Sequence, residues 1–536
     1  MNIDISKHDL KTYEATADYH KKVTTKNQEC QQWMDLAIKQ LFNFNHFEAI
    51  CCFRKAIEND SECPMAYWGI SYSLGPHYNY MDINEEMYST ALEYSKKANE
   101  LITKVEVQPW EKDLIEVLKF RYIESMPLEG EAFQKNLQDY RTEFKKLYEK
   151  YTDDLDIVSL YCESVMNLRP WMLWKKDGTP HEEAVEVREV LEKALKKGFH
   201  LQTFHLYIHL LELSPFMRNT VKYADELAEK SEGLGHLLHM PSHIYIQIGE
   251  YKKSIDCNIR GIEADKKVKE RIGEDNFFTF YRAHNVAFAA WAAMFIGNYD
   301  IAIKYSNELK LIMNDNVLSV HADSLEFFYH FYLHVNVRFG RWDDIINEEI
   351  NNKKNYELTR VVQYYAKTVA HAVKGNIKEA EENLEKFLKY KVELPEKRIL
   401  GNNPCQPVLD VGVAMAQGEL FYRKGEYEKA FEYLRKSVDL CDNIIYDEPW
   451  NWPQPPRHAL AALLLEQGHV DESISVYKRD LEIYPENIWS LVGLDECYQK
   501  KGLVEERNEL KARLDLAKSN SDNYIHSSCF CKKKAL

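Results

Sequence analysis

Histidine pairs with helical spacing are the residues of this chain best suited to chemistry. His205 and His209 are four residues apart, and so are His239 and His243. In a helix each pair projects from one face, with about 5–6 Å between the Cβ atoms, which suits two imidazole ligands on one metal ion. A further histidine, His284, follows on a later apolar segment. This spacing predicts a metal site.

The predicted ligands are imidazoles from neighbouring helical segments: His209, His239, His243 and His284. Further candidate ligands come from the same segments: His205, His236 and Glu212. Several imidazoles favour iron, copper or zinc and leave an open coordination position for substrate or oxygen. The alternative is that these histidines only donate hydrogen bonds to carbonyls and aromatic hydroxyls in a tyrosine-rich groove.

Two features near these pairs have competing interpretations. Pro241 stands between His239 and His243. Inside a helix it would cost about 3 kcal/mol and kink the axis, whereas as the first helical residue it costs nothing. The pair His330 and His334 lies among aromatic residues and is more typical of a packed helix face.

Helix pairs are the elements that must position the histidines. A glycine, then an apolar residue and soon a small one, marks a left-handed turn between two closely packed helices. The glycines of this signature lie 34 to 50 residues apart: Gly249, Gly297, Gly340, Gly375, Gly425, Gly468 and Gly502. In the last unit Ser473 and Tyr477 precede Trp489 and Gly493, and this unit resembles the tetratricopeptide repeat.

The repeats predict an all-α fold, a right-handed superhelical solenoid of degenerate tetratricopeptide helix-turn-helix units. We expect a helical lead-in over residues 1–29 and a continuous solenoid over 30–515 that is less regular at 100–200. A disordered tail is expected over 516–536.

Longer motifs extend the resemblance. MAYWGISYSLGP, LRPWMLW, GHLLHMPSHIY, YRAHN and DEPWNWPQPPRHAL are similar to a family of tetratricopeptide-repeat proteins known mostly from bacterial genomes, over roughly Cys30 to Gly502. A fainter likeness is to the animal tetratricopeptide repeat protein thirty-eight group. The resemblance implies a helical-repeat protein and assigns no reaction to it.

Composition limits the partners and the compartment. The net charge of -16 and the lack of a basic cluster longer than Lys532–Lys534 argue against nucleic acid as a partner. No stretch approaches the roughly 18 apolar residues of a membrane span, and the N-terminus lacks an apolar signal region. The eleven cysteines form no C-x-x-C pair, so we expect no disulfide framework and a cytoplasmic protein.

Two classes of function stay open at this point. The concave groove of the array would bind a protein or peptide partner, with the histidine-rich pocket at its centre. Alternatively, the chain is a metal-dependent enzyme that acts on a small molecule through its histidines. The loops Asn167–Ala184 and Tyr446–Leu460, rich in tryptophan and proline, would then close over the groove, although local packing also explains them. Whether the chain is an enzyme is left open.

Overall fold

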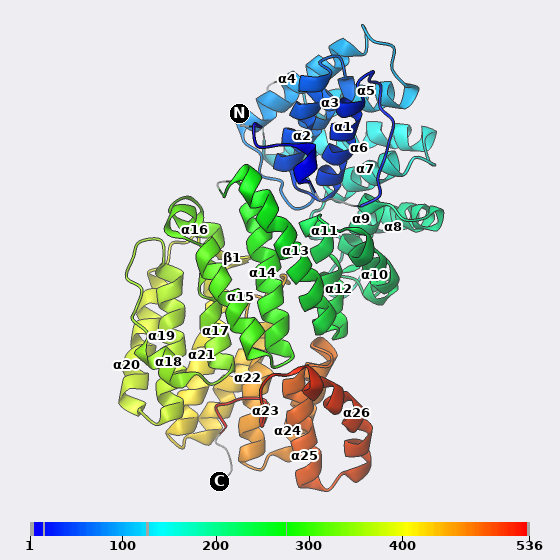
Figure 1. The fold of residues 1–536 in the computed structure, drawn as a ribbon. Helices are drawn as coiled ribbons and strands as arrows, with labels where there is room; N and C mark the ends of the chain where they lie inside the picture. The colour runs from blue at the N-terminus through cyan, green and yellow to red at the C-terminus, as the bar shows by residue number, and fades with distance from the viewer. Residues whose placement is uncertain (1–4, 14–16, 125–127, 275, 533–536) are drawn as a thin grey trace. The chain divides into compact units, whose positions relative to one another are not determined.

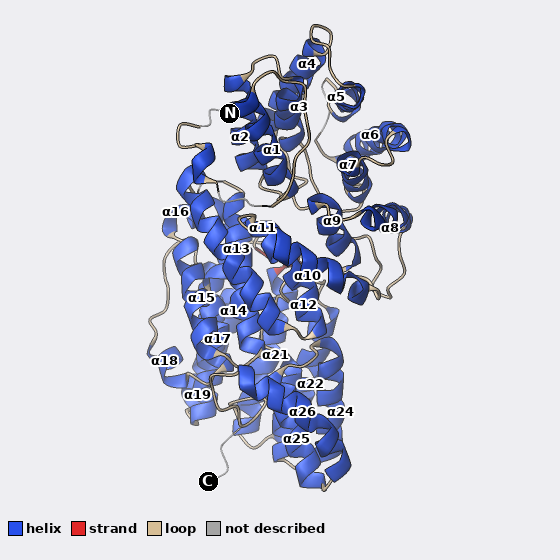
Figure 2. Cartoon of the chain, turned by 45° about the vertical axis from the view of Figure 1, so that its right-hand side comes forward, coloured by secondary structure: helices blue, strands red, loops and turns tan. Residues whose placement is uncertain are grey.

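Helices joined by short turns make up most of the chain in the computed structural model, which describes residues 5–13, 17–124, 128–274 and 276–532 (Figures 1 and 2). Contacts group the chain into two compact units, Met1–Ile244 with Arg260–Phe278, and Tyr245–Ile259 with Thr279–Leu536. The prediction of an all-α fold built from helix-turn-helix pairs is confirmed.

The first unit contains the helices that carry most of the predicted site residues. Its helices are α1 (Gln28–Phe42), α2 (His46–Asn59), α3 (Pro64–Ser73), α4 (Glu85–Leu101), α5 (Pro109–Arg121), α6 (Gly130–Lys150), α7 (Leu155–Met166), α8 (Glu182–Ala194), α9 (Leu201–Leu211), α10 (Val221–Lys230) and α11 (Gly235–His239). The short 3-10 helices η1 (Leu10–Thr12), η2 (Leu195–Lys197) and η3 (Met217–Thr220) accompany them. Helices α12 (Pro241–Ile248) and α13 (Tyr251–Ile272) contribute residues to both units.

The second unit continues the helix pairs to the end of the chain. It contains α14 (Phe278–Phe295, from Thr279), α15 (Tyr299–Ile312), α16 (Asp315–Tyr329), α17 (Phe331–Arg338), α18 (Trp342–Asn347), α19 (Glu357–Lys374), α20 (Ile377–Val392), α21 (Cys405–Arg423), α22 (Tyr427–Asn443), α23 (Pro456–Glu466), α24 (Val470–Ile483), α25 (Ile488–Lys501) and α26 (Val504–Asn520). A small antiparallel pair, β1 (Ile399–Leu400) and β2 (Asn403–Pro404), aligns Ile399 with Pro404.

Small residues let the helices of a pair approach closely. A Cβ atom added to Gly493 of α25 would lie 2.2 Å from the ring of Tyr477 on α24, and one added to Gly69 of α3 would lie 2.2 Å from Phe53 on α2. Both aromatic rings therefore occupy the space that a side chain would need. These contacts confirm the small-against-large packing that the repeat motif predicts.

The turn glycines also behave as predicted. All seven glycines of the repeat signature have φ between 63° and 88°, a left-handed conformation that side chains disfavour. Gly375 caps α19 and Gly502 caps α25 in this conformation.

Both ends of the chain differ from the expectation. Among described residues before Gln28, only Leu10–Thr12 forms a helical turn, so the described part of the lead-in is mainly irregular rather than helical. Residues 521–532 are packed rather than disordered. Ile525 is buried, and Ser528 donates a hydrogen bond to the carbonyl of His458 at 2.7 Å.

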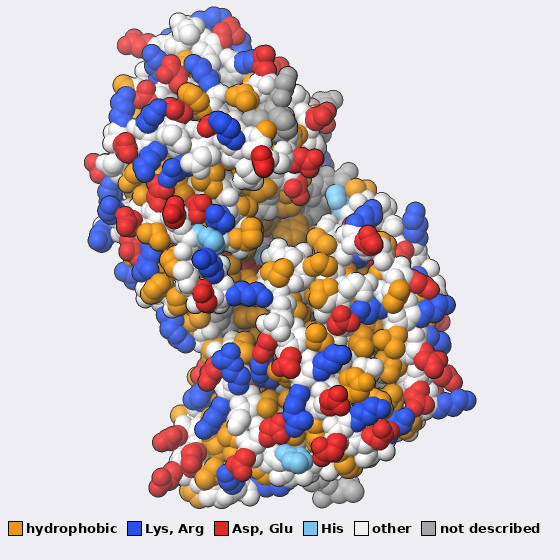
Figure 3. Space-filling model, turned by 180° about the vertical axis from the view of Figure 1, so that it is seen from behind, with side chains coloured by type: hydrophobic (Ala, Val, Ile, Leu, Met, Phe, Trp, Pro, Cys, Tyr) orange, Lys and Arg blue, Asp and Glu red, His pale blue; other side chains and the backbone are white. Residues whose placement is uncertain are grey.

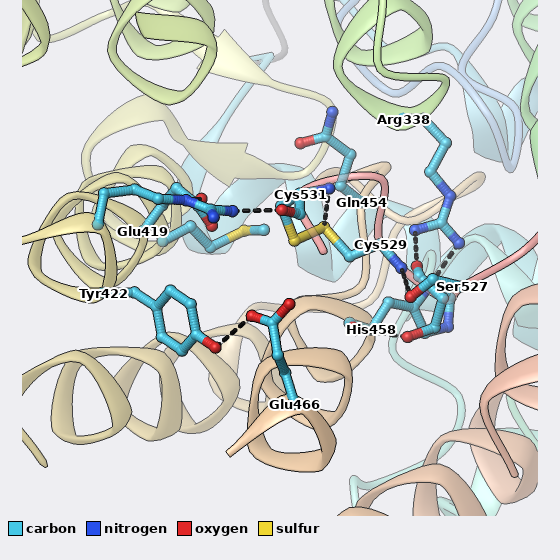
Figure 4. The surroundings of a disulfide bond; sticks show 12 residues. Arg338, Glu419, Tyr422, Gln454, His458, Glu466, Ser527, Cys529 and Cys531 are labelled. Carbon is cyan, nitrogen blue, oxygen red and sulfur yellow. Dashed lines mark hydrogen bonds and ion pairs between the residues drawn. A yellow bond between two sulfur atoms is a disulfide. The ribbon is translucent and has the colours of Figure 1, made fainter. Parts of the chain in front are cut away.

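A local disulfide joins Cys529 to Cys531 in this packed tail (Figure 4). Arg423 donates a hydrogen bond to the carbonyl of Cys531, and Arg338 donates one to the carbonyl of Ser528 at 3.4 Å. The backbone carbonyls of the tail therefore have hydrogen-bond partners in the second unit. The sequence of the tail alone does not indicate these contacts. Residues 533–536 lie outside the described part of the chain.

The surface carries charges of both signs. Lysine and arginine side chains are interspersed with aspartate and glutamate over the face in Figure 3. Within the described ranges, no helix combines the length and the apolar character that crossing a membrane requires.

Candidate functional site

Six polar side chains of the first unit gather where α9 meets α11 and the start of α12. Each is at most 2% exposed, and the set comprises His205, His209, Glu212, His236, His239 and His243. Buried polar groups need hydrogen-bond partners or a bound ion, because burial removes their contacts with water. The six residues therefore form the strongest candidate for a functional site.

Three of these histidines offer ring nitrogens that lie close enough to share an ion. Ligand atoms of His205, His209 and His236 all lie within 4.8 Å of one another. Nε2 of His205 is 3.1 Å from Nε2 of His236. Two nitrogens on one tetrahedral zinc ion, each about 2.0–2.1 Å from the metal, lie about 3.3 Å apart. The first pair already has this separation, and the third nitrogen needs a movement on the order of 1 Å.

Hydrogen bonds at Nδ1 determine which nitrogen these rings can offer. Nδ1 of His205 lies 3.0 Å from the carbonyl oxygen of Phe42, and Nδ1 of His209 lies 3.0 Å from Oε1 of Glu212. A carbonyl or a carboxylate can only accept, so Nδ1 carries the proton in both rings. In the neutral form the lone pair is then on Nε2, the atom that would bind a metal.

Glu212 links this group to a second pair. Its Oε2 atom lies 2.7 Å from Nδ1 of His243, and Nε2 of His243 lies 2.6 Å from Nε2 of His239. By the same argument the lone pair of His243 is on Nε2, so His239 donates the proton of that contact. A separation of 2.6 Å is shorter than two ligands of one ion adopt, about 2.9 Å at a right angle. His239 and His243 are therefore hydrogen-bonded to each other in this geometry.

Burial keeps two rings of the first group, those of His205 and His236, neutral. It lowers the pKa of His205 to about 3, and burial together with the neighbouring histidines lowers the pKa of His236 well below the usual 6.5. Neutral imidazole is the form that coordinates a metal, so protons do not compete for these nitrogens near pH 7.

Phe44 forms the aromatic wall of the site. The centre of its ring lies 4.3 Å from that of His205, 5.7 Å from His236 and 6.1 Å from His209. Its φ of 52° is left-handed, which costs on the order of 1 kcal/mol for a residue with a side chain. Such strained residues concentrate at functional sites.

The loop between α7 and α8 covers His209 from another side. Trp171 lies 5.5 Å from His209 between ring centres, and Tyr78 lies 5.1 Å from it. The backbone N–H of Trp171 donates to the hydroxyl of Tyr78 at 3.3 Å, and Trp171 also has a left-handed φ of 60°. This is one of the loops that sequence analysis considered as a lid.

Other predicted residues have separate surroundings. His284 lies on α14 in the second unit, where its ring centre is 4.9 Å from that of Phe288 and 5.8 Å from that of Phe280. His209, His239 and His243 belong to the first unit, so the convergence of His284 with them stays a prediction. Pro241 is the first residue of α12, but Met240 before it keeps helical φ and ψ of -49° and -40°, so both interpretations of Pro241 stay open.

The pair His330 and His334 belongs to an aromatic cluster of the second unit. The ring centre of His334 lies 5.0 Å from that of Trp452 and 6.2 Å from that of Tyr365. Burial lowers the pKa of His334 to about 3. This environment agrees with the packed helix face that the sequence suggests.

Sequence reasoning missed two further histidines beside the site. The ring centres of His46 and His77 are 4.1 Å apart, and Phe44 lies 5.0 Å from His77 and 4.3 Å from His205. Neither residue belongs to a spaced pair, and both precede His205 by more than 120 residues. No local signal joins them to the later pairs, because stacking of repeats brings them together.

Comparisons with known proteins support the repeat fold. Residues 412–444 match the family model described as tetratricopeptide repeat. They span the end of α21, the helix α22 and the turn between them, where a Cβ on Gly418 would lie 2.6 Å from Leu434. The tetratricopeptide repeat that the sequence motif predicts is thereby confirmed in this segment. No curated protein sequence matches the chain significantly.

Three solved structures that match most of this chain are distant from it. A human IFIT1 dimer with m7Gppp-AAAA is 15% identical, covers 92% of this chain and 91% of its own, and has a TM-score of 0.28. Yeast Tom70 is 12% identical, with coverage of 92% and 95% and a TM-score of 0.32. The TPR domain of P58(IPK) is 12% identical, with coverage of 92% and 98% and a TM-score of 0.22.

Such low scores support no conclusion about what this chain binds. The expectation that nucleic acid is not a partner therefore stays a prediction.

Proposed function

We propose that this tetratricopeptide-repeat chain binds a divalent transition-metal ion in its first unit, through Nε2 of His205, His209 and His236. The observation that carries the proposal is the set of three buried imidazoles whose nitrogens lie within 4.8 Å of one another. Such a set has no structural need to be this dense, since one backbone carbonyl satisfies a buried histidine as well.

The hydrogen bonds behind the rings support a metal site. Phe42 and Glu212 hold Nδ1 of His205 and His209, and metal-ligating histidines almost always donate their other N–H to a carbonyl or a carboxylate. These contacts select the tautomer and restrict the rotation of the rings. The same geometry in water-exposed histidines would be lost to solvent, but these side chains are buried.

The ligand set indicates which metals fit. Neutral imidazole suits zinc, copper, iron and nickel, and it is a poor ligand for magnesium or calcium, which prefer oxygen. Three protein ligands leave the fourth position of a tetrahedral ion for water or a small molecule. The ion would therefore act as a binding centre for an exogenous ligand, with Phe44, Tyr78 and Trp171 as its apolar wall.

A metal-free network is the competing account. In it, Nε2–H of His236 donates to Nε2 of His205 across 3.1 Å, and no ion is needed for this pair. The two accounts predict different results when a histidine is replaced. A metal site loses its ion when one ligand is removed, whereas a hydrogen-bond network takes up no ion in any variant.

Metal analysis of purified full-length protein tests the proposal. We expect about one equivalent of cobalt, zinc or copper to bind a chain purified without a histidine tag, and the absorption bands of cobalt to report tetrahedral nitrogen ligands. His209→Asn should lower the metal affinity at least tenfold. His334→Asn, which changes an equally buried histidine of the second unit, should leave it unchanged.

Circular dichroism of both variants checks that they fold. Uptake that is absent in the wild type, or equal in wild type and folded His209→Asn, would contradict the proposal.

A further inference from the structure

An extended segment at the start of the chain lies along the inner helices of the first unit. This N-terminal strap, residues 17–27, contains no helix and ends at Asn27, whose side chain caps α1. Its burial alternates from residue 17 to residue 23, so that Ala17, Tyr19, Lys21 and Val23 face inward while the residues between them are exposed. This period of two is typical of an extended peptide with one face bound.

Four helices form the groove beneath the strap. Tyr19, Lys21 and Val23 pack over these helices and leave a small pocket, which they line together with residues of α1, α3, α5 and α7. The apolar side chains that line the pocket come from all four helices: Met34, Ile38, Phe42, Met65, Trp68, Trp110, Leu114 and Leu160. Alternate helices of a repeat array line its inner surface, so the strap occupies the binding face of this unit.

Side chains of the groove bind the main chain of the strap. Gln31 donates to the carbonyl of Lys21 and accepts from the N–H of Val23, both at 2.9 Å. Oε1 of Glu111 accepts from the N–H of Thr24 at 2.7 Å. Contacts of this kind recognise an extended backbone whatever its side chains, as grooves that hold peptides do.

Acidic residues of the groove favour a positively charged side chain in the bound segment. Nζ of Lys21 lies 2.6 Å from Asp154 and 2.9 Å from Asp156, and 4.4 Å from the ring centre of Trp110. The hydroxyl of Tyr19 donates to Asp156 at 2.8 Å. A cation between two carboxylates and an indole ring is a specific lysine site, because each partner favours the charged form.

The strap is held in a way that another peptide can copy. Ala17 and Val23 are buried, the main chain is held by hydrogen bonds, and Lys21, whose side chain is 21% exposed, pairs with both Asp154 and Asp156. A tethered segment profits from a local concentration in the millimolar range, so even weak contacts keep it bound. A peptide in trans therefore has to compete with this tether.

From these contacts we propose that the groove is a docking surface for an extended basic segment of a partner protein. This segment has an aromatic residue, a lysine two positions later and a β-branched residue two positions after the lysine. The strap is its intramolecular competitor and covers the groove until the partner displaces it. This proposal does not depend on the metal site, since none of its contacts involves the three candidate ligands.

A peptide-binding experiment on the full-length chain tests the proposal. The probe is a fluorescent peptide with the sequence of residues 17–27, ADYHKKVTTKN. Tyr19→Ala with Lys21→Ala removes the two polar anchors of the strap, and this variant should bind the probe at least tenfold more tightly than the wild type. The matched control changes outward-facing residues, Asp18→Ala with Lys22→Ala, and should bind it as the wild type does.

Two further variants locate the binding. Adding Asp154→Asn and Asp156→Asn to the loosened chain should abolish probe binding, and a probe with glutamate in place of its first lysine should not bind. Equal probe binding by the folded loosened variant and the wild type would overturn the proposal, as would binding that survives the loss of both aspartates.

Two other readouts complete the test. Hydrogen exchange of the wild type tests the proposal even if the loosened variant does not fold. The amides of Val23 and Thr24 should lose protection when excess probe is added, and unchanged protection would contradict displacement. Mass photometry of the wild type should give monomers, whereas dimers held through exchanged straps would show that the groove binds a second copy of this chain and would overturn the proposal of a partner protein.

Discussion

The main-chain carbonyl of Phe42 accepts a hydrogen bond from Nδ1 of His205 at 3.0 Å, across 163 residues of sequence. Phe42 is the last residue of α1, and its side chain lines the groove under the strap, where its ring centre lies 5.7 Å from that of Tyr19. The end of α1 thus holds a candidate ligand with its backbone and the strap with its side chain. Carbonyls at a helix C-terminus lack helical partners, which makes this one free to accept from His205.

Removing the carboxylate behind His209 should weaken metal binding without removing a ligand. Glu212 accepts from Nδ1 of His209 and of His243, so Glu212→Gln loses the charge that fixes both tautomers. We expect a 10- to 100-fold loss of zinc affinity, the usual effect of changing an outer partner, measured by competition with a chromophoric chelator. Glu226→Gln, a change at an exposed pair with Lys230, is the control. Equal affinities for zinc in Glu212→Gln and the wild type would show that Glu212 does not support a ligand.

Chelation should lower the thermal stability of the first unit. An ion at a free concentration 100 times its dissociation constant stabilises the folded state by about 2.7 kcal/mol. For a unit of this size that corresponds to about 5–10 °C in Tm. Calorimetry with and without a chelator measures the shift, and the variant His209→Asn should show none. A shift of the same size in that variant would mean that the chelator acts elsewhere.

Much of the fold follows from local sequence, and the residues concerned show why. Gly493 and Tyr477 are predicted partners because the repeat motif fixes their positions on two consecutive helices, and they are in contact. The pair His205 and His209 follows from helical spacing in the same way. In both cases the partners are few residues apart, so periodicity alone determines which face they share.

The remainder of the site depends on contacts between distant repeats. Phe44 touches His205 and His236 only because α1, α9 and α11 pack together, and no spacing in the sequence encodes that contact. The strap is missed for another reason. Its alternation of buried and exposed residues involves a tyrosine and a lysine, which hydrophobic patterns do not record.

The packing of the last repeat gives a direct stability prediction. Gly493→Ala adds a methyl group 2.2 Å from the ring of Tyr477, so the ring or the helix must shift. Overpacking of this kind costs about 1–3 kcal/mol, which outweighs the gain of up to about 1 kcal/mol in helix propensity. Chemical denaturation of Gly493→Ala should therefore give a lower midpoint. In the background Tyr477→Leu the same change should cost less, and equal costs in both backgrounds would contradict the contact.

A buried carboxyl group gives the clearest pH dependence of the first unit. Burial raises the pKa of Glu163 to about 7, against an ordinary value near 4.5, although Arg121 lowers it in part. The folded state therefore binds a proton more tightly than the unfolded state does. This stabilisation is complete below about pH 4.5 and is lost as the pH rises to about 7, by about 2–3 kcal/mol between pH 5 and pH 8.

The variant Glu163→Gln removes that titration and retains the size of the side chain. Tyr72 donates to Glu163 at 3.2 Å and Gln202 at 3.3 Å, and an amide oxygen can accept both hydrogen bonds. We expect the variant to gain stability relative to the wild type at pH 8 but not at pH 5, measured by urea denaturation. Glu100→Gln, at an exposed position on α4, controls for the loss of one charge. A difference between variant and wild type that stays constant from pH 5 to pH 8 would mean that Glu163 is ionised in the folded protein throughout, and that Arg121 outweighs its burial.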